Sequence, residues 1–137
     1  MSTEANKAIV HRYYTEVLNQ RNVAVLDELF SSTFVSHISV GPDISLEPYK
    51  QAVAMSHTAF PDLSVTVQDQ IAEADKVMTR WVAHGTHQGS FAGIPATGRP
   101  VTVTAIHIHR VEHGKIVEHW EAINMLGVLQ QLGVIPQ

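Results

Sequence analysis

Residues 101–124 read VTVTAIHIHRVEHGKIVEHWEAIN, and this stretch decides the fold. Two segments with alternating side-chain character lie on either side of the turn Glu112-His113-Gly114. Alternation with a period of two is typical of a strand that has one buried face. The stretch therefore predicts a hairpin, with one strand over 99–111 and the next over 115–124.

The length of the turn decides which residues of the hairpin face each other. Glycine suits the left-handed position that closes a three-residue loop, so the glycine of this turn favours such a loop. His107 then lies opposite His119, and Ala105 lies opposite Glu121. A loop of two or four residues would place His107 opposite Trp120 instead.

One face of the predicted hairpin gathers imidazoles and a carboxylate among small apolar residues. That face carries Val101, Val103, Ala105, His107, His109, Val117, His119, Glu121 and Ile123. The opposite face carries Thr102, Thr104, Ile106, Ile108, Arg110, Glu118, Trp120 and Asn124. If the first face is turned toward the helices, its polar groups line a pocket; if it is turned outward, they are solvated.

Helical patterns come first along the chain and strand patterns follow. Apolar spacing predicts helices from residue 2 or 3 to 18, over 23–30 and over 45–60, with a short extended piece at 34–37. Strands are expected from 63, over 77–89 and over the hairpin, and 126–132 is a short helix or coil. This order predicts one α+β domain over 1–137, with a curved, mostly antiparallel sheet of about four long strands over about three helices and a cone-shaped pocket.

The composition excludes several classes of protein. The chain has 137 residues, 45% of them hydrophobic, a formal net charge of −4 and no cysteine. A negative charge argues against a nucleic acid or an anionic membrane as partner. No apolar run is long enough to span a membrane and the start does not read as a signal peptide, so a cytoplasmic protein is expected.

Short motifs spread along the chain carry a family resemblance. They are Asn6-Lys7, Tyr13-Tyr14, Asn19, VLDELF (25–30), FVSH (34–37), FPD (60–62), GTHQG (85–89), GIPATG (93–98), GKIVEHW (114–120) and LGVLQQLG (126–133). In this order they resemble the SnoaL-like polyketide cyclases, within the nuclear-transport-factor-2-like cone fold. The resemblance covers almost the whole chain.

The resemblance implies an enzyme that closes the last ring of an anthracycline precursor by intramolecular aldol condensation, without metal or cofactor. In the family, a carboxylate on the last strand acts as acid and base, and a histidine on the preceding strand assists. These positions fall on Glu121 and His107. Known cyclases have aspartate where this chain has Glu121. Relatives often associate through the outer sheet face, so a homodimer or higher assembly is expected.

The predicted catalytic residues are Glu121, His107 and His119. Glu121 takes a proton from a carbon beside a carbonyl and returns it to the new alkoxide. Burial among apolar residues should raise the pKa of Glu121. A neutral His107 can donate a hydrogen bond to the enolate oxygen, and His119 orients Glu121.

Further residues are expected to contact a small, apolar, carbonyl-bearing substrate. They are His37 at the pocket mouth, Trp81, Ala105, His109 and Phe91. Arg80 and Trp81 alternate on one strand, so only one of them faces the pocket. The loop 89–100, which contains Phe91, either lids the pocket or forms a rigid crossover.

His107, His109 and His119 offer an alternative, a metal site. The first two share a face but stand ~6.5 Å apart along their strand, and no supporting groups are evident. No metal is therefore expected. Besides the cyclase, the sequence leaves open a non-catalytic binding protein on the same fold, or a related isomerase or epoxide hydrolase.

Overall fold

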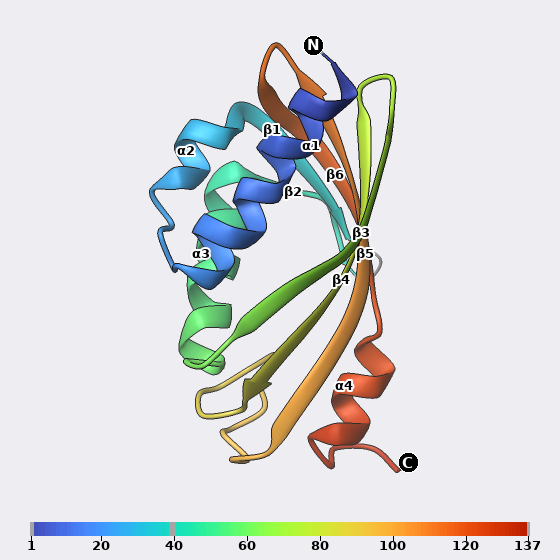
Figure 1. Ribbon diagram of the computed structural model, residues 1–137. Helices are drawn as coiled ribbons and strands as arrows, with labels where there is room; N and C mark the ends of the chain where they lie inside the picture. Colours follow the sequence, from blue (N-terminus) through green and yellow to red (C-terminus); the bar gives the residue numbers. More distant parts are fainter. Residues whose placement is uncertain (1, 39–40, 137) are drawn as a thin grey trace.

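The computed structural model describes residues 2–38 and 41–136, and it confirms a mixed α+β fold. A six-stranded sheet has the order β2-β1-β6-β5-β4-β3. Figure 1 shows α1, α2 and α3 on one side of this curved sheet, with α4 beside the end where β5 begins. The elements are α1 (Thr3–Arg12), the π-helix η1 (Tyr13–Asn19), α2 (Val25–Leu29), β1 (Phe30–Ile38), β2 (Ile44–Ser45), α3 (Leu46–Ala59), β3 (Ser64–Glu73), β4 (Lys76–Thr86), β5 (Pro100–Glu112), β6 (Lys115–Ile123) and α4 (Met125–Gln131).

The turn between β5 and β6 has two residues, so the predicted three-residue loop is wrong. Glu112 lies opposite Lys115, and His113 and Gly114 form the turn between them. Both turn residues are left-handed, with φ values of 51° and 76°. Two such residues are typical of a type I′ turn, which matches the twist of the strands it joins. His113 therefore adopts a conformation that the prediction had reserved for Gly114 alone.

A bulge in β6 then changes the register of the hairpin. Val111 lies opposite Ile116, but the next opposed residues are Arg110 and Glu118, which leaves Val117 as an extra residue in β6. Such an insertion reverses the alternation of faces beyond it. The two-residue turn therefore does not place His107 opposite Trp120.

Beyond the bulge, His107 lies opposite Glu121 and His109 lies opposite His119. Both pairings differ by two positions from the predicted register. The predicted inward residues of β5, and His119 and Glu121 of β6, are nevertheless correct, because a shift of two residues preserves the face. Val117 is the exception, since it is the extra residue of the bulge and Ile116 is buried beside it. Ala105, His107, His109 and His119 are all buried, whereas Thr102, Thr104, Ile106 and Ile108 are exposed on the opposite face.

The first helix changes its geometry midway. Ser2 caps α1 by accepting a hydrogen bond from the backbone N–H of Ala5. From Tyr13 onward the chain continues as a π-helix, and its last turn bonds the N–H of Gln20 to the carbonyl of Thr15. The wider turn brings the neighbouring side chains of Tyr13 and Tyr14 into the core together. Single π-turns of this kind are frequent at functional sites.

Asn19 attaches the end of this helix to the start of β3. Its side-chain amide donates to the carbonyl of Val65 and accepts from the N–H of the same residue, at 2.8 and 2.7 Å. The amide thus satisfies backbone groups at the edge of the sheet. It fixes the helix layer over the strands that carry the pocket.

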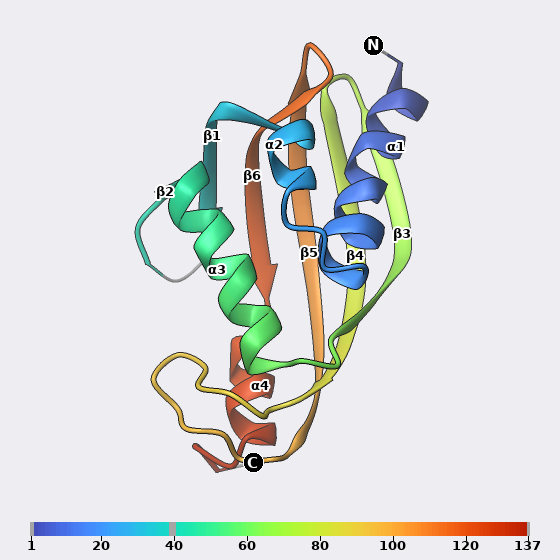
Figure 2. The same cartoon turned by 90° about the vertical axis from the view of Figure 1, so that its left-hand side faces the viewer.

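The extended piece predicted at 34–37 is part of a nine-residue strand. β1 pairs in parallel with β6 and antiparallel with β2, which makes six strands instead of about four. The polar residues Ser31, Ser32 and Thr33 hide the strand because they interrupt its alternation. Figure 2 shows α1, α2 and α3 all lying over this sheet. Among the described residues, no helix combines the length and the apolar character needed to cross a membrane.

Candidate active site

A cavity of about 240 Å³ lies between the helices and the inner face of the sheet. Its wall is mostly apolar and takes residues from η1, α3, β3 to β6 and α4. The polar side chains of the wall are Tyr13, Tyr49, Ser56, His84, His107 and Glu121. An apolar cavity with a few convergent polar groups is typical of a small-molecule site.

His107 and Glu121 meet in the wall of this cavity. His107 Nε2 lies 2.8 Å from a carboxylate oxygen of Glu121, across the opposed strands β5 and β6. The His107 side chain is 2% exposed and that of Glu121 is 23% exposed. The carboxylate is therefore the part of this pair that a ligand in the cavity can reach.

The other ring nitrogen of His107 faces two donors. The indole N–H of Trp81 donates to Nδ1 at 2.9 Å, and the hydroxyl of Tyr14 lies 2.8 Å from the same atom. An indole N–H can only donate, so Nδ1 must carry a lone pair. The proton of a neutral His107 therefore sits on Nε2, which donates it to Glu121. The His107 N–H, which had been predicted to donate to an enolate oxygen, is therefore donated to Glu121 instead.

The pKa of Glu121 lies below its ordinary value of 4.5. Burial is the largest single effect and raises this pKa, as the sequence predicted, but the hydrogen bond from His107 and the attraction of a charged His107 ring together lower it by more. The net shift is therefore downward, against the predicted rise. A donor held against the carboxylate favours its charged form. Glu121 is accordingly a carboxylate at neutral pH and can accept a proton.

His119 and His109 lie behind His107 and do not line the cavity. Both are 0% exposed, and His119 stacks on the His107 ring with centroids 4.9 Å apart. His119 Nε2 lies 2.6 Å from the Ser36 hydroxyl, and its Nδ1 lies 3.3 Å from His109 Nε2. Burial holds the pKa of both imidazoles well below its usual range, so both are neutral.

Two predicted substrate contacts are thereby corrected, because His109 and Ala105 are inward-facing but buried behind the cavity wall. His119 makes no hydrogen bond to Glu121, which it had been predicted to orient. Its hydrogen bonds go to Ser36 and His109, and its ring supports His107 by stacking.

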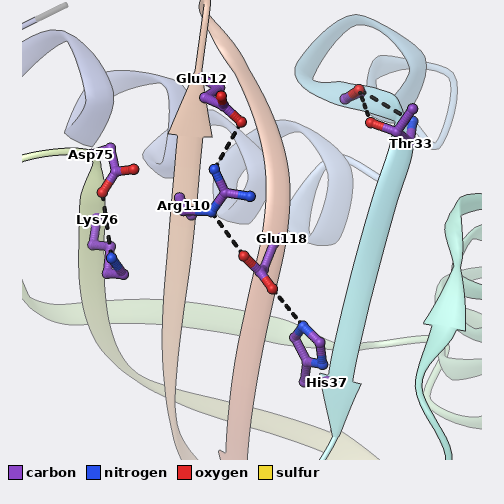
Figure 3. A network of polar contacts seen from close by, with 8 residues as sticks. Thr33, His37, Asp75, Lys76, Arg110, Glu112 and Glu118 are labelled. Atoms are coloured by element: carbon purple, nitrogen blue, oxygen red, sulfur yellow. Dashed lines mark hydrogen bonds and ion pairs between the residues drawn. The ribbon is translucent and has the colours of Figure 1, made fainter.

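His37 lies on the outer face of the sheet, so its predicted place at the pocket mouth is wrong. In Figure 3 it is the end of a chain of contacts that runs through Glu118 to Arg110 and Glu112. His37 Nε2 lies 2.6 Å from Glu118, and its ring stacks on Trp120 at 5.3 Å. The bond to Glu118 raises the pKa of His37 above 6.5. Its neighbour Ser36 takes the inward position instead.

Trp81 faces the cavity and Arg80 faces out. Trp81 lines the wall, while Arg80 pairs with Asp69 on the neighbouring strand. The choice between them, which the sequence left open, is settled by the strand register that sets Trp81 opposite inward-facing Ala105.

The loop between β4 and β5 contributes Phe91 to the cavity wall, as predicted. Phe91 and Ile94 form an isolated bridge, and both pack on a small apolar cluster with Phe60 and Val128. At its base, His87 Nδ1 accepts from the backbone N–H of Thr97 at 3.2 Å. Of the two predicted roles of the loop, these contacts support the crossover that packs on the end of the domain over the lid.

His107, His119 and Glu121 also meet a geometric criterion for a metal site. Their ligand atoms lie within 4.8 Å of one another. A metal on His107 Nε2 would, however, force the ring proton onto Nδ1, directly against the indole N–H of Trp81. Two donors facing each other in a buried site are costly. The proton arrangement thus favours acid-base chemistry over metal ligation.

Three tyrosines contribute to the site, and the sequence had not singled them out as site residues. Tyr14 contacts His107, and Tyr13 and Tyr49 line the cavity with their hydroxyls hydrogen-bonded to each other. Tyr13 and Tyr49 fit the apolar spacing of the predicted helices. That spacing does not distinguish a tyrosine that only packs in the core from one whose hydroxyl faces a cavity.

Comparisons with known proteins agree with the fold and give the family. A family model described as SnoaL-like polyketide cyclase matches residues 8–132. The nogalonic acid methyl ester cyclase of Streptomyces nogalater is 29% identical over 108 residues, 78% of each chain. The aklanonic acid methyl ester cyclase DnrD of Streptomyces peucetius is 39% identical over 57 residues, 42% of this chain and 39% of that protein.

Among solved structures, AclR of Streptomyces galilaeus, a proposed hydroxylase, superimposes with a TM-score of 0.90. It is 30% identical, and the alignment covers 99% of this chain and 85% of AclR. The family match extends over nearly all of the elements that build the cavity. The chain belongs to the SnoaL-like polyketide cyclase family.

Proposed function

We propose that this protein closes a ring in a polyketide by intramolecular aldol chemistry, with Glu121 as the base. The observation that carries the proposal is the Glu121 carboxylate, held by His107 at 2.8 Å in the wall of an apolar cavity. The cyclase names of the relatives support the same chemistry.

The reaction needs one proton acceptor that later becomes a donor. Glu121 removes a proton from carbon, and the electron pair of that C–H bond moves into an enolate. The enolate carbon forms a C–C bond with a second carbonyl carbon, and the resulting alkoxide takes the proton back from Glu121. The product is an isomer of the substrate, so this sequence consumes no cofactor.

The low pKa of Glu121 limits the substrates that it can deprotonate. A weakly basic carboxylate can only ionise a carbon that is already acidic, such as one between two carbonyl groups. Polyketides contain such carbons. We therefore propose a small, mostly apolar polyketide with a β-dicarbonyl unit placed at Glu121.

A Glu121→Gln variant tests the proposal, with aklanonic and nogalonic acid methyl esters as substrates. Turnover should fall by about 10²- to 10⁴-fold while affinity for the ester changes little. Glu118→Gln, on the same strand but the outer face, is the matched control and should keep full turnover. Binding without product in the unmodified protein would favour a non-catalytic binding protein. Full turnover in Glu121→Gln would exclude the base.

The similarity to AclR favours a second candidate, a hydroxylase. The two reactions differ in the composition of their products. An aldol closure leaves the molecular mass unchanged, whereas hydroxylation adds one oxygen atom and requires an oxidant. Mass spectrometry of the product distinguishes them directly.

We also propose that two copies associate through the outer sheet face. Ile71, Met78, Ile108 and Trp120 are successive cross-strand partners on β3, β4, β5 and β6. They form an apolar row across the sheet that ends at His37, which stacks on Trp120. Ile108 and Trp120 are each 36% exposed, as expected of residues that a second copy would cover.

A further inference from the structure

The hydroxyls of Tyr13 and Tyr49 form a buried hydrogen-bonded pair in the wall of the cavity. We infer that this pair is a binding site for an oxygen anion, the enolate oxygen that forms when Glu121 removes a proton. The inference rests on the proposed function and adds the group that receives the negative charge. It also names a ligand class, planar enols and phenols.

The cavity needs a donor other than His107 for that oxygen. His107 directs its Nε2–H at Glu121, so its proton is committed. The hydroxyl of Ser56 donates to the carbonyl of Val53 at 2.7 Å. His84 lies in an exposed part of the wall and bonds to Thr102. The tyrosine hydroxyls remain as buried donors on the wall that also carries Glu121.

A count of protons shows that the tyrosine pair has a hydrogen to spare. Two hydroxyls carry two hydrogens, and their mutual bond uses one. Within residues 2–38 and 41–136, neither hydroxyl has another hydrogen-bond partner in the protein. The second hydrogen is therefore available to a ligand in the cavity. Burial raises the pKa of both phenols, so both keep their protons throughout the neutral range.

The packing of the two rings indicates which hydroxyl faces the ligand. The Tyr13 ring lies beside His107, with centroids 6.2 Å apart, and so next to the base. The Tyr49 ring lies beside His119, two residues before Glu121 on β6, with centroids 5.1 Å apart. Tyr49 therefore donates to Tyr13, and Tyr13 donates to the ligand. A hydroxyl that accepts a hydrogen bond is itself a stronger donor.

This arrangement separates the two charges of the reaction. The proton leaves carbon for Glu121 on β6, and the electron pair of the broken C–H bond develops on an oxygen that faces Tyr13 on η1. Donors that are oriented before the reaction stabilise such an anion without reorganising. The strand thus supplies the base, and the helix layer supplies the anion site.

Binding of 2-naphthol to the Glu121→Gln variant tests the inference. This variant imitates the protonated base, and naphtholate imitates the enolate, so no turnover is needed. The absorbance of bound naphthol should show more naphtholate than free naphthol does at the same pH. Adding Tyr13→Phe should weaken naphtholate binding about 10- to 100-fold, the effect of one bond to a charged group. Adding Tyr49→Phe should weaken it by a few-fold, because only the cooperative part is lost.

Thr58→Ala is the matched control, since it removes a hydroxyl from the same helix as Tyr49 at an exposed position outside the cavity wall. It should bind naphtholate like the parent variant. Unchanged binding in both phenylalanine variants, or an equal loss in Thr58→Ala, would overturn the anion site. A larger loss for Tyr49→Phe than for Tyr13→Phe would overturn Tyr13 as the terminal donor. If Tyr13→Phe does not fold, the absence of extra naphtholate in Glu121→Gln alone overturns the inference. Failure of Glu121 as base would appear only in turnover.

Discussion

The indole N–H of Trp81 donates to Nδ1 of His107 at 2.9 Å, and this bond determines which nitrogen of His107 carries the proton. With Nδ1 as acceptor, Nε2 becomes the donor, and Glu121 receives it at 2.8 Å. A single polarised chain thus runs from β4 through β5 to β6. Its far end is the carboxylate that faces the cavity.

Replacing Trp81 by phenylalanine should release this constraint. Phenylalanine keeps an aromatic ring against His107 but has no N–H, so the Glu121 carboxylate alone then favours a proton on Nε2 and some of the protein can place it on Nδ1. Turnover should fall about tenfold or more, because part of the protein then presents a lone pair to Glu121. Nitrogen NMR of His107 should show a single tautomer with Nε2–H in the wild type and a mixture in the variant.

Tyr14→Phe is the control for this prediction. It removes the hydroxyl that lies 2.8 Å from Nδ1 of His107 but leaves the hydrogen bond from Trp81 in place. The wild-type tautomer should persist in this variant. A mixture of tautomers in Tyr14→Phe and a single one in Trp81→Phe would assign the constraint to the tyrosine instead.

The pH dependence of turnover should reflect the lowered pKa of Glu121. The carboxylate must be ionised to act as a base, so the acid limb of the turnover profile should lie below pH 4.5, the ordinary value of the group. His107→Leu removes the hydrogen bond and leaves the effect of burial. The acid limb should then move above pH 4.5, and an unmoved limb would contradict the assigned cause.

The same shift should appear in stability. A carboxyl whose folded-state pKa is lowered stabilises the fold above its unfolded-state pKa of about 4.3 and loses this contribution as pH falls through the folded value. The difference in free energy of unfolding between wild type and Glu121→Gln should be constant near neutral pH and change only below about pH 4.3. Urea denaturation at several pH values measures it.

The inward face of the hairpin could be predicted from the sequence because alternation survives a shift of two residues. His107 and Glu121 face the cavity in both the predicted and the observed register. Their direct contact could not be predicted, because it depends on the bulge at Val117. Nothing in the local residues distinguishes that bulge from regular alternation.

The tyrosine site escaped prediction for a different reason. The π-helix at Tyr13 has no local signature in the sequence. The choice between Trp81 and Arg80 likewise required the register between β4 and β5. Periodicity identifies a face, but contacts between elements decide which polar groups meet on it.

Asn19→Ala should destabilise the fold by about 2 kcal/mol. The change removes two hydrogen bonds to the backbone of Val65 and leaves that N–H and carbonyl without their partner. Urea denaturation gives the free energy of unfolding. Asn22→Ala, at an exposed position three residues away, is the control and should change stability by less than about 0.5 kcal/mol.

An equal loss in the two asparagine variants would contradict the assigned contribution of the contact between Asn19 and β3. The contact also bears on the cavity, because Val65 lines its wall. Asn19→Ala should therefore weaken 2-naphthol binding as well, whereas Asn22→Ala should leave it unchanged.

Ile108→Arg should convert the proposed dimer into a monomer. Ile108 lies in the middle of the apolar outer row between Met78 and Trp120, so a guanidinium there would be buried without a partner on association. Sedimentation velocity should show a single smaller species for the variant and a dimer for the wild type.

Met55→Arg is the control, because Met55 is 64% exposed on α3, on the helix side of the sheet. A wild-type monomer, or dissociation caused by Met55→Arg instead, would place the interface elsewhere. Since Ile108 points away from the cavity, naphthol binding should survive its substitution and report that the fold is intact.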